Sequence, residues 1–254
     1  MWKAFQFLSP PLNETPIIVL GNQKSGTSVI AHLLADIGGL TKTIDIPPFW
    51  GKRGKAIVMG QESFAAAVTR AKAYFRADLI KEPMFTFFAG QIVEYFPQAK
   101  YVFIVRDPRD NIRSLLNSRK LPGHLQELTT DHLETLSDNS ILFDQEVWGG
   151  ENENYVGVLA YRWNKAVDNY RKHAAHAILV RYEDFMLDKL AYIQELACKL
   201  DIPAVNNISK RLDLAYQPRG NRNITWDVFF GVDNLQTIHR ICGETMLELG
   251  YAIS

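Results

Sequence analysis

Short apolar runs alternate along the chain with longer stretches in which apolar residues recur every three or four positions. The runs at 17–20 and 101–105 are continuously apolar and end at Gly or at charged residues, which predicts buried strands. The stretches 25–37 and 155–173 repeat apolar residues at i, i+3, i+4 and i+7, which predicts amphipathic helices. The same criteria predict strands at 79–80 and 177–180 and helices at 62–75, 85–96, 108–119, 190–200 and 235–249.

This alternation of strands and helices predicts an α/β fold. Strands that follow one another through helical crossovers form a mostly parallel sheet with helices on both faces, so we expect a single three-layer α/β/α domain over residues 1–254. The stretch 121–155 interrupts the pattern. In open sheets of this kind, ligands bind beside the carboxyl ends of the strands. Candidate chemistry is therefore sought directly after each strand.

Composition narrows the class of protein. The chain has 254 residues, with 28 Lys+Arg against 28 Asp+Glu, and a zero net charge argues against a nucleic-acid partner. Cys198 and Cys242 fit no metal or redox spacing, so we interpret both as reduced core thiols. No run approaches the ~20 apolar residues of a membrane-spanning helix, and no signal peptide is recognisable. We expect a soluble cytoplasmic protein.

The segment after the first predicted strand, Gly21-Asn-Gln-Lys-Ser-Gly-Thr-Ser28, leads directly into a helix. A small-residue turn at a helix N-terminus presents backbone N–H groups and a positive dipole, and it predicts a P-loop-like phosphate site. Gly21 and Gly26 have the spacing of the ATP-binding Walker loop, but Thr27 stands where that loop has its lysine. The lysine is Lys24, on the crest of the loop. No acidic magnesium partner follows a strand, so we expect no metal.

A second candidate for anion binding follows the strand at 101–105. Arg106 comes where this strand ends, and Ser114 lies eight residues later, about two helical turns along a helix opened by Asp107-Pro108. A guanidinium and a hydroxyl that converge there can hold a dianionic phosphate through charge-assisted hydrogen bonds.

Both motifs, in this order, resemble those of the sulfotransferases that use 3′-phosphoadenosine 5′-phosphosulfate (PAPS). The loop matches that superfamily's 5′-phosphosulfate loop, with Gln23 in place of the usual Pro. The resemblance implies that Lys24 binds the leaving 5′-phosphate and the bridging oxygen. It also implies that Arg106 and Ser114 bind the 3′-phosphate, which distinguishes PAPS from ATP. The remaining loop residues implied to hold the 5′-phosphate are Ser25, Gly26, Thr27 and Ser28.

Three weaker similarities complete the resemblance, which runs from about residue 16 to 226 with a gap at 121–155. Tyr182 lies in a Tyr-Glu-Asp segment whose tyrosine contacts adenine in the family. Arg219 and Gly220 resemble a C-terminal Arg-Lys-Gly loop that closes over the 3′-phosphate, although loosely. Lys81 resembles a lysine that follows the second strand of the family and lies near the acceptor.

The reaction implied is an in-line transfer of the sulfuryl group from PAPS to a hydroxyl or amine, which leaves adenosine 3′,5′-bisphosphate. Acceptors of this family are small molecules, lipids or carbohydrates. A general base should remove the acceptor's proton. Asp45, 21 residues after Lys24, is the nearest match to a family glutamate, and Glu82 and Glu62 compete with it. His124 and His132 qualify only if their segment folds over the site.

Two further features are left open. Residues 121–155 contain eight acidic residues and no Lys or Arg, and they are either a solvated surface or an acceptor-side insertion or lid. The basic residues at 52–55 are interpreted as a surface loop. The alternatives to a sulfotransferase are an ATP-dependent P-loop kinase-like phosphotransferase and a catalytically silent nucleotide-binding protein.

Overall fold

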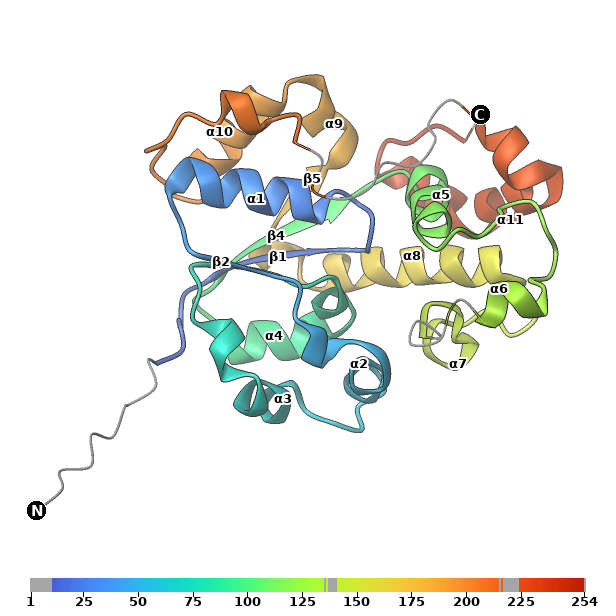
Figure 1. Cartoon of the computed structure of the whole chain (residues 1–254), viewed down its shortest axis with the longest axis horizontal. Helices are drawn as coiled ribbons and strands as arrows, with labels where there is room; N and C mark the ends of the chain where they lie inside the picture. The colour runs from blue at the N-terminus through green and yellow to red at the C-terminus, as the bar shows by residue number, and fades with distance from the viewer. Residues whose placement is uncertain (1–10, 135, 137–140, 215, 217–223, 254) are drawn as a thin grey trace, which may run out of the picture.

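The structure, a computed structural model, describes residues 11–134, 136, 141–214, 216 and 224–253 (Figure 1). Within them, five parallel strands form one sheet in the order β2-β3-β1-β4-β5. The strands are β1 (Ile17–Gly21), β2 (Lys42–Ile44), β3 (Leu79–Lys81), β4 (Lys100–Val105) and β5 (Ala177–Arg181). The predicted α/β class with a parallel sheet is therefore confirmed.

Successive residues of the central strands face opposite sides of the sheet, as the two-residue period of a strand requires. Ile17 and Val19 pack on the side of α1 and α10, whereas Ile18 and Leu20 pack with α3, α4, α8 and α11 on the other side. Both sides are apolar because helices cover both, and this produces the continuous apolar runs of the sequence. Figure 1 shows the resulting layers, with α1, α9 and α10 on one side of the sheet and α4 and α8 on the other.

The helices occupy the intervals between strands and most of the C-terminal part. The α-helices are α1 (Thr27–Gly38), α2 (Gly51–Val58), α3 (Phe64–Arg70), α4 (Ala89–Tyr95), α5 (Pro108–Ser118), α6 (Thr130–Glu134), α7 (Gln145–Trp148), α8 (Tyr155–Lys172), α9 (Tyr182–Leu187), α10 (Lys189–Lys199) and α11 (Trp226–Glu248). Short 3₁₀ helices are η1 (Pro47–Phe49), η2 (Lys72–Phe75), η3 (Pro83–Phe88), η5 (Ala174–His176) and η6 (Ser209–Arg211).

Several sequence expectations need correction. The expected helix at 62–75 is divided into α3 and η2, and that at 85–96 into η3 and α4. Residues 52–55 are part of α2 rather than a loop. Cys242 is buried as expected, but Cys198 is exposed on α10 and is not a core thiol. Among the described residues, no helix is long and apolar enough to cross a membrane.

Candidate functional site

A cleft of about 450 Å³ opens beside the carboxyl ends of the strands. The phosphate-loop candidate after the central strand β1 forms its middle. On one side, the ends of β4 and β5 supply Arg106 and Tyr182, and we call this the β4/β5 half. On the other side, the ends of β2 and β3 supply Asp45 and Lys81, and we call this the β2/β3 half. The strand order thus places the loop between two different sets of side chains.

The backbone of the loop is fixed by close contacts that require glycine. Gly21 has a φ of 141°, and a Cβ there would lie 2.4 Å from the carbonyl oxygen of Ile104. Gly26 has a φ of 93°, and a Cβ would lie 2.2 Å from the ring of Tyr182. Tyr182 therefore packs directly on the loop. Lys24 has a φ of 69°, a conformation that a lysine adopts only when its surroundings impose it.

Behind the loop, two asparagines hold it from inside the protein. The amide of Asn111, on α5, donates to the carbonyl of Gln23 at 2.8 Å and to Oγ of Ser25 at 2.9 Å. The amide of Asn22 donates to Oδ1 of Asn111 at 2.9 Å. The backbone N–H of Ser25 also donates to the carbonyl of Asn22 at 3.1 Å. The side chain of Ser25 is thus directed into this network, and Ser25 does not line the cleft, unlike Gly26, Thr27 and Ser28.

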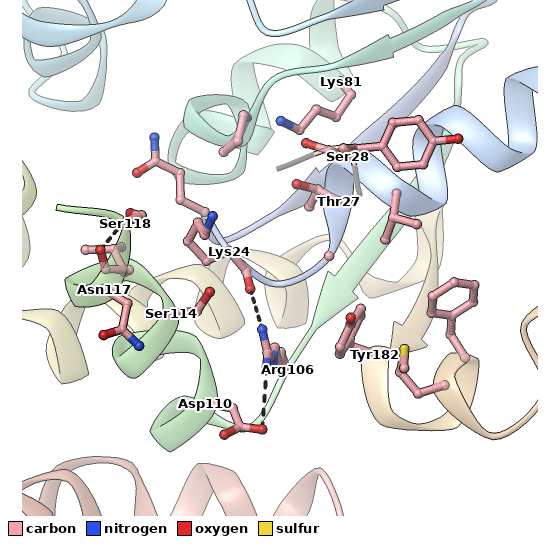
Figure 2. A pocket seen from close by; sticks show the side chains of 18 of the residues that line it. Lys24, Thr27, Ser28, Lys81, Arg106, Asp110, Ser114, Asn117, Ser118 and Tyr182 are labelled. Carbon is pink, nitrogen blue, oxygen red and sulfur yellow. Dashed lines mark hydrogen bonds and ion pairs between the residues drawn. The ribbon is translucent and has the colours of Figure 1, made fainter. Parts of the chain in front are cut away.

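Lys24 carries a cation into a cleft that already contains several. Burial lowers the pKa of Lys24, and the nearby charges of Arg106, Arg119 and Lys81 lower it further. The N-terminus of α1 adds the positive end of a helix dipole at the same place. Figure 2 shows Lys24 between Arg106 and Lys81, with Thr27 and Ser28 at the start of the helix. Such a site favours an anion with more than one negative charge.

Arg106 joins the loop to the β4/β5 half. Its Nη1 donates to the carbonyl of Lys24 at 3.1 Å, and its guanidinium lies 4.8 Å from the centre of the Tyr182 ring. Its own carbonyl accepts a hydrogen bond from the indole of Trp163 at 2.9 Å. Nε of Arg106 is buried and has no hydrogen-bond partner among the described residues. This orphaned donor is consistent with a site that an anion completes.

One carboxylate, Asp110, serves two guanidiniums in this half. It lies 3.5 Å from Arg106 and 2.6 Å from Arg113, and it accepts a hydrogen bond from the indole of Trp226 at 2.9 Å. Burial alone would raise the pKa of Asp110, but the Trp226 hydrogen bond and the two arginine charges lower it below the usual value. Ser114 lines the cleft one turn further along α5. Arg106, Arg113 and Asp110 together therefore have a net charge of +1.

In the β2/β3 half, Lys81 and Asp45 form an ion pair. Nζ of Lys81 lies 2.5 Å from Oδ1 of Asp45, and the backbone N–H of Asp45 donates to the carbonyl of Lys81 at 2.9 Å. Lys81 is almost fully buried, whereas about a third of the Asp45 side chain is exposed to the cleft. Asp45 has a φ of 61°, so its backbone is also held in a left-handed conformation. The pair offers an accessible carboxylate oriented by a buried cation.

Glu82 does not lie in the cleft. Its carboxylate is fully buried and accepts hydrogen bonds from the backbone N–H of Ile46 at 2.7 Å and of Met84 at 3.0 Å. It also accepts one from the indole of Trp50 at 3.0 Å, and so fixes a half-exposed aromatic ring at the cleft wall. Burial raises the pKa of Glu82, and these hydrogen bonds oppose the rise. Glu82 therefore acts as a structural anchor here rather than as a group that meets a substrate.

The structure does not bring the other base candidates into the cleft. Glu62 pairs with Arg70 and lies 3.9 Å from Nε of Arg53. His124 and His132 are not among the residues that line the cleft. No described residue of 121–155 lines it either; Asp144 and Glu146 bind Lys55, and Glu153 binds Arg240. The predicted ligands Arg219 and Gly220 lie outside the described residues.

Sequence reasoning missed several residues of the site. Asn111 holds the loop, Arg113 and Arg119 add positive charge to the cleft, and Trp50 forms part of its wall. Asn111 lies five residues after Arg106, in the first turn of a helix that the sequence predicts. This position is the one signal for its role that the sequence offers. The position of Trp50 depends on a hydrogen bond to a residue 32 positions away, which no local pattern encodes.

Three solved structures of sulfotransferases have the same fold. STF9 from Mycobacterium avium matches with a TM-score of 0.55 and 14% identity, over 96% of this chain and 78% of that one. The sulfotransferase domain of the curacin biosynthetic pathway matches with a TM-score of 0.50 and 14% identity, over 97% and 99%. A sulfotransferase from Alicyclobacillus acidocaldarius matches equally well, at 0.50 and 14%, over 93% and 97%. These similarities establish the fold.

A search of curated protein sequences finds no match. The family model described as "Sulfotransferase family" matches residues 52–206, which is more than half of the chain. The match begins after the phosphate loop, so it rests on residues other than the loop motif that first suggested the resemblance. On this evidence, the chain belongs to the sulfotransferase family.

Proposed function

We propose that the protein transfers the sulfuryl group of PAPS to a hydroxyl or amine of a small-molecule, lipid or carbohydrate acceptor. The observation that carries this proposal is the presence of two groups of basic and hydroxyl side chains in one cleft, each suited to an anion. One is the loop with Lys24 at the N-terminus of α1, and the other is the group of Arg106, Arg113 and Ser114 at the end of β4. A nucleotide with phosphates at both the 3′ and the 5′ position matches two such places.

The residues beside these places fit a nucleoside. Tyr182 and Phe185 are 5.9 Å apart between ring centres, and both line the cleft together with Met186. Aromatic and thioether side chains provide the flat, polarisable surface on which a purine stacks. Arg106 lies over Tyr182, so the base site and the 3′-phosphate site share a side chain. We therefore assign Tyr182 to the adenine and Arg106 with Ser114 to the 3′-phosphate.

PAPS supplies an activated sulfuryl group, and the chain's own residues position and neutralise the charges around it. In-line transfer places increasing negative charge on the leaving 5′-phosphate, and Lys24 with the N–H groups at Thr27 and Ser28 lies where that charge would be stabilised. Asp45 is our candidate for the base that takes the acceptor's proton, because its carboxylate is exposed to the cleft. Lys81 orients this carboxylate. The acceptor then occupies the β2/β3 half.

The kinase alternative is less well supported by the geometry. A Walker loop places its lysine at the start of the helix, where it holds the β- and γ-phosphates. Here Thr27 begins α1, and Lys24 lies before the loop turns into the helix. ATP has no 3′-phosphate, so it offers no anionic group for the second basic group around Arg106.

Nucleotide binding tests the proposal directly. Calorimetry should show that adenosine 3′,5′-bisphosphate binds more tightly than adenosine 5′-monophosphate, ADP or ATP with magnesium. Incubation with PAPS and a panel of alcohols, phenols, glycosides and amines should release adenosine 3′,5′-bisphosphate with at least one of them. Tighter binding of ATP with magnesium than of the bisphosphate would contradict the proposal. The Lys24→Ala, Arg106→Ala double variant is the control and should bind the bisphosphate weakly.

A further inference from the structure

Arg162, on α8, is a charged side chain buried completely inside the protein. Burial, together with the nearby charge of Arg119, lowers its pKa to about 9, so it remains a cation at neutral pH. Its Nη1 donates to Oδ1 of Asn22, while Nε and Nη2 have no hydrogen-bond partner among the described residues. No carboxylate in the described part of the chain pairs with it. A buried charge without a counterion is strongly unfavourable, so its presence calls for an explanation.

Aromatic rings offset only part of this cost. The guanidinium lies 4.6 Å from the centre of the Phe87 ring and 5.1 Å from that of Trp148. The two rings also contact each other, with 4.5 Å between their centres. Cation–π contacts of this kind stabilise a desolvated guanidinium, but they supply no negative charge. Apolar side chains would fill the same space at a lower cost.

The position of Arg162 relates it to the phosphate loop. Arg162 donates a hydrogen bond to Asn22, and Asn22 donates one to Asn111. Asn111 in turn donates to both Gln23 and Ser25. Three successive hydrogen bonds, through the side chains of Asn22 and Asn111, thus connect Arg162 to the two residues on either side of Lys24. Arg162 lies behind the loop and does not line the cleft.

Arg162 is also the innermost member of a row of cations. Its charge interacts with that of Arg119, which lines the cleft, and the charge of Arg119 in turn interacts with that of Lys24. No carboxylate among the described residues pairs with Arg119 either, and its Nε is buried without a hydrogen-bond partner there. Three interacting cations therefore extend from the interior to the loop, where the 5′ end of the donor is assigned.

We infer that Arg162 is a positioning residue for the 5′ side of the donor. It holds the loop through Asn22 and adds a positive potential that no carboxylate paired with it in the described part of the chain balances, and that a bound anion at the loop would balance. The inference rests on the proposed function, because it assumes that the loop binds the 5′-phosphate group of the nucleotide. It assigns to Arg162 no contact with substrate.

Two variants separate charge from hydrogen bonding. Arg162→Gln keeps a donor for Asn22 and removes the charge, whereas Arg162→Lys keeps the charge. Calorimetry should show that Arg162→Gln weakens the binding of adenosine 3′,5′-bisphosphate by about 3- to 30-fold. The affinity for adenosine 3′-monophosphate, which has no 5′-phosphate, should not change. Arg162→Lys should retain most of the bisphosphate affinity. Arg240→Gln, at an exposed ion pair with Glu153, is the matched control and should change neither affinity.

Each outcome decides the inference. An equal loss for both nucleotides would mean that Arg162 only maintains the fold of the cleft, and an unchanged bisphosphate affinity would mean that its charge is irrelevant; either overturns the inference. The melting temperature of Arg162→Gln without nucleotide should be at least that of the wild type, because an unbalanced charge has been removed. If Arg162→Gln does not fold, Arg162→Met, which also removes the charge, replaces it in the same nucleotide comparison, and an unchanged bisphosphate affinity or an equal loss for both nucleotides again overturns the inference. Wild-type protein that binds neither nucleotide would contradict the proposed function itself.

Discussion

The two halves of the cleft balance their charges differently. In the β4/β5 half, one carboxylate, Asp110, faces the guanidiniums of Arg106 and Arg113, so positive charge is in excess. In the β2/β3 half, Lys81 is matched one for one by Asp45. An excess of positive charge suits a ligand that brings phosphates, and a balanced pair suits a neutral acceptor that must lose a proton. In the proposed function, this difference is the reason for assigning the donor to the β4/β5 half and the acceptor to the β2/β3 half.

The loop in the middle of the cleft and the β2/β3 half share a feature. Among the described residues, four other than glycine have a positive φ, and two of them, Lys24 and Asp45, line the cleft. Such conformations are unfavourable for most residues other than Gly, less so for Asn and Asp, and they persist where the surrounding structure imposes them. Lys24 and Asp45 are also the two residues to which we assign roles in the chemical step. A left-handed backbone thus accompanies both of the residues to which the proposal gives these roles.

The largest expected effect comes from Asp45→Asn, which tests the β2/β3 half. Asparagine tolerates the left-handed backbone at this position and keeps the size of the side chain, but it cannot accept a proton. If Asp45 is the base, kcat should fall by about 10²- to 10⁴-fold. Steady-state kinetics with PAPS and an active acceptor measures this. Affinity for adenosine 3′,5′-bisphosphate should stay within about twofold of the wild type, because separate sites that share no partners act independently within about 0.5 kcal/mol.

A loss of bisphosphate affinity in Asp45→Asn would contradict the assignment of the β2/β3 half to the acceptor. A normal kcat would exclude Asp45 as the base. Asp201→Asn is a matched control. Asp201 also has a positive φ, of 52°, but its exposed carboxylate pairs with Lys100, and it does not line the cleft. It should leave both quantities unchanged.

Arg106→Ala tests the β4/β5 half. Removing a buried guanidinium that contacts the loop, Asp110 and Tyr182 leaves Asp110 with one partner fewer and removes the proposed 3′-phosphate ligand. Binding of adenosine 3′,5′-bisphosphate should weaken by about 2–5 kcal/mol, whereas binding of adenosine 5′-monophosphate should weaken much less. Calorimetric titration of both nucleotides measures the difference. An equal loss for both would show that Arg106 does not recognise the 3′-phosphate.

The β4/β5 half was the easier one to predict from the sequence. Its main residues follow directly from local patterns: a strand ending at Arg106, a helix opened by Asp107-Pro108, and Ser114 two turns along it. The fold was predictable for the same reason, since buried parallel strands produce continuous apolar runs. The predicted helix bounds are wrong where helices are short or interrupted, as at α3 and η2. A helical repeat of apolar residues is recognised over more residues than these elements contain.

The β2/β3 half was harder because its side chains meet over long separations in sequence. β2 has three half-buried residues and gives no apolar run. Glu82 was a base candidate by proximity to Lys81, but successive strand residues point to opposite sides, and Glu82 turns into the protein to bind Ile46 and Trp50. Arg162 likewise occupies a position in an amphipathic helix, and only the fold reveals that it is buried behind the loop.

Glu82→Gln tests whether Glu82 stabilises the wall of the β2/β3 half through its hydrogen bonds or takes part in proton transfer. An amide at this position can accept at only one end, so it cannot satisfy Met84 at one oxygen and Ile46 with Trp50 at the other. We expect the free energy of unfolding to fall by about 1–3 kcal/mol in denaturant titrations. The KM for the acceptor should rise because Trp50 loses its anchor. Unchanged bisphosphate affinity is the internal control, and a kcat loss like that of Asp45→Asn at normal stability would reinstate Glu82 as a base.

The smallest expected effect is the pH dependence of donor binding, which should arise from the loop and not from the β2/β3 half. Burial and the charges of Arg106, Arg119 and Lys81 lower the pKa of Lys24 in the free protein. A bound dianion favours the charged lysine and raises that pKa, so binding takes up a proton at alkaline pH. Affinity for adenosine 3′,5′-bisphosphate should therefore fall as the pH rises through the pKa of free Lys24, by at most about tenfold per pH unit. Titrations in two buffers of different ionisation enthalpy measure the proton uptake. Lys24→Arg, which keeps its charge over this range, should remove the dependence; a slope that persists in this variant would assign the titration to another group.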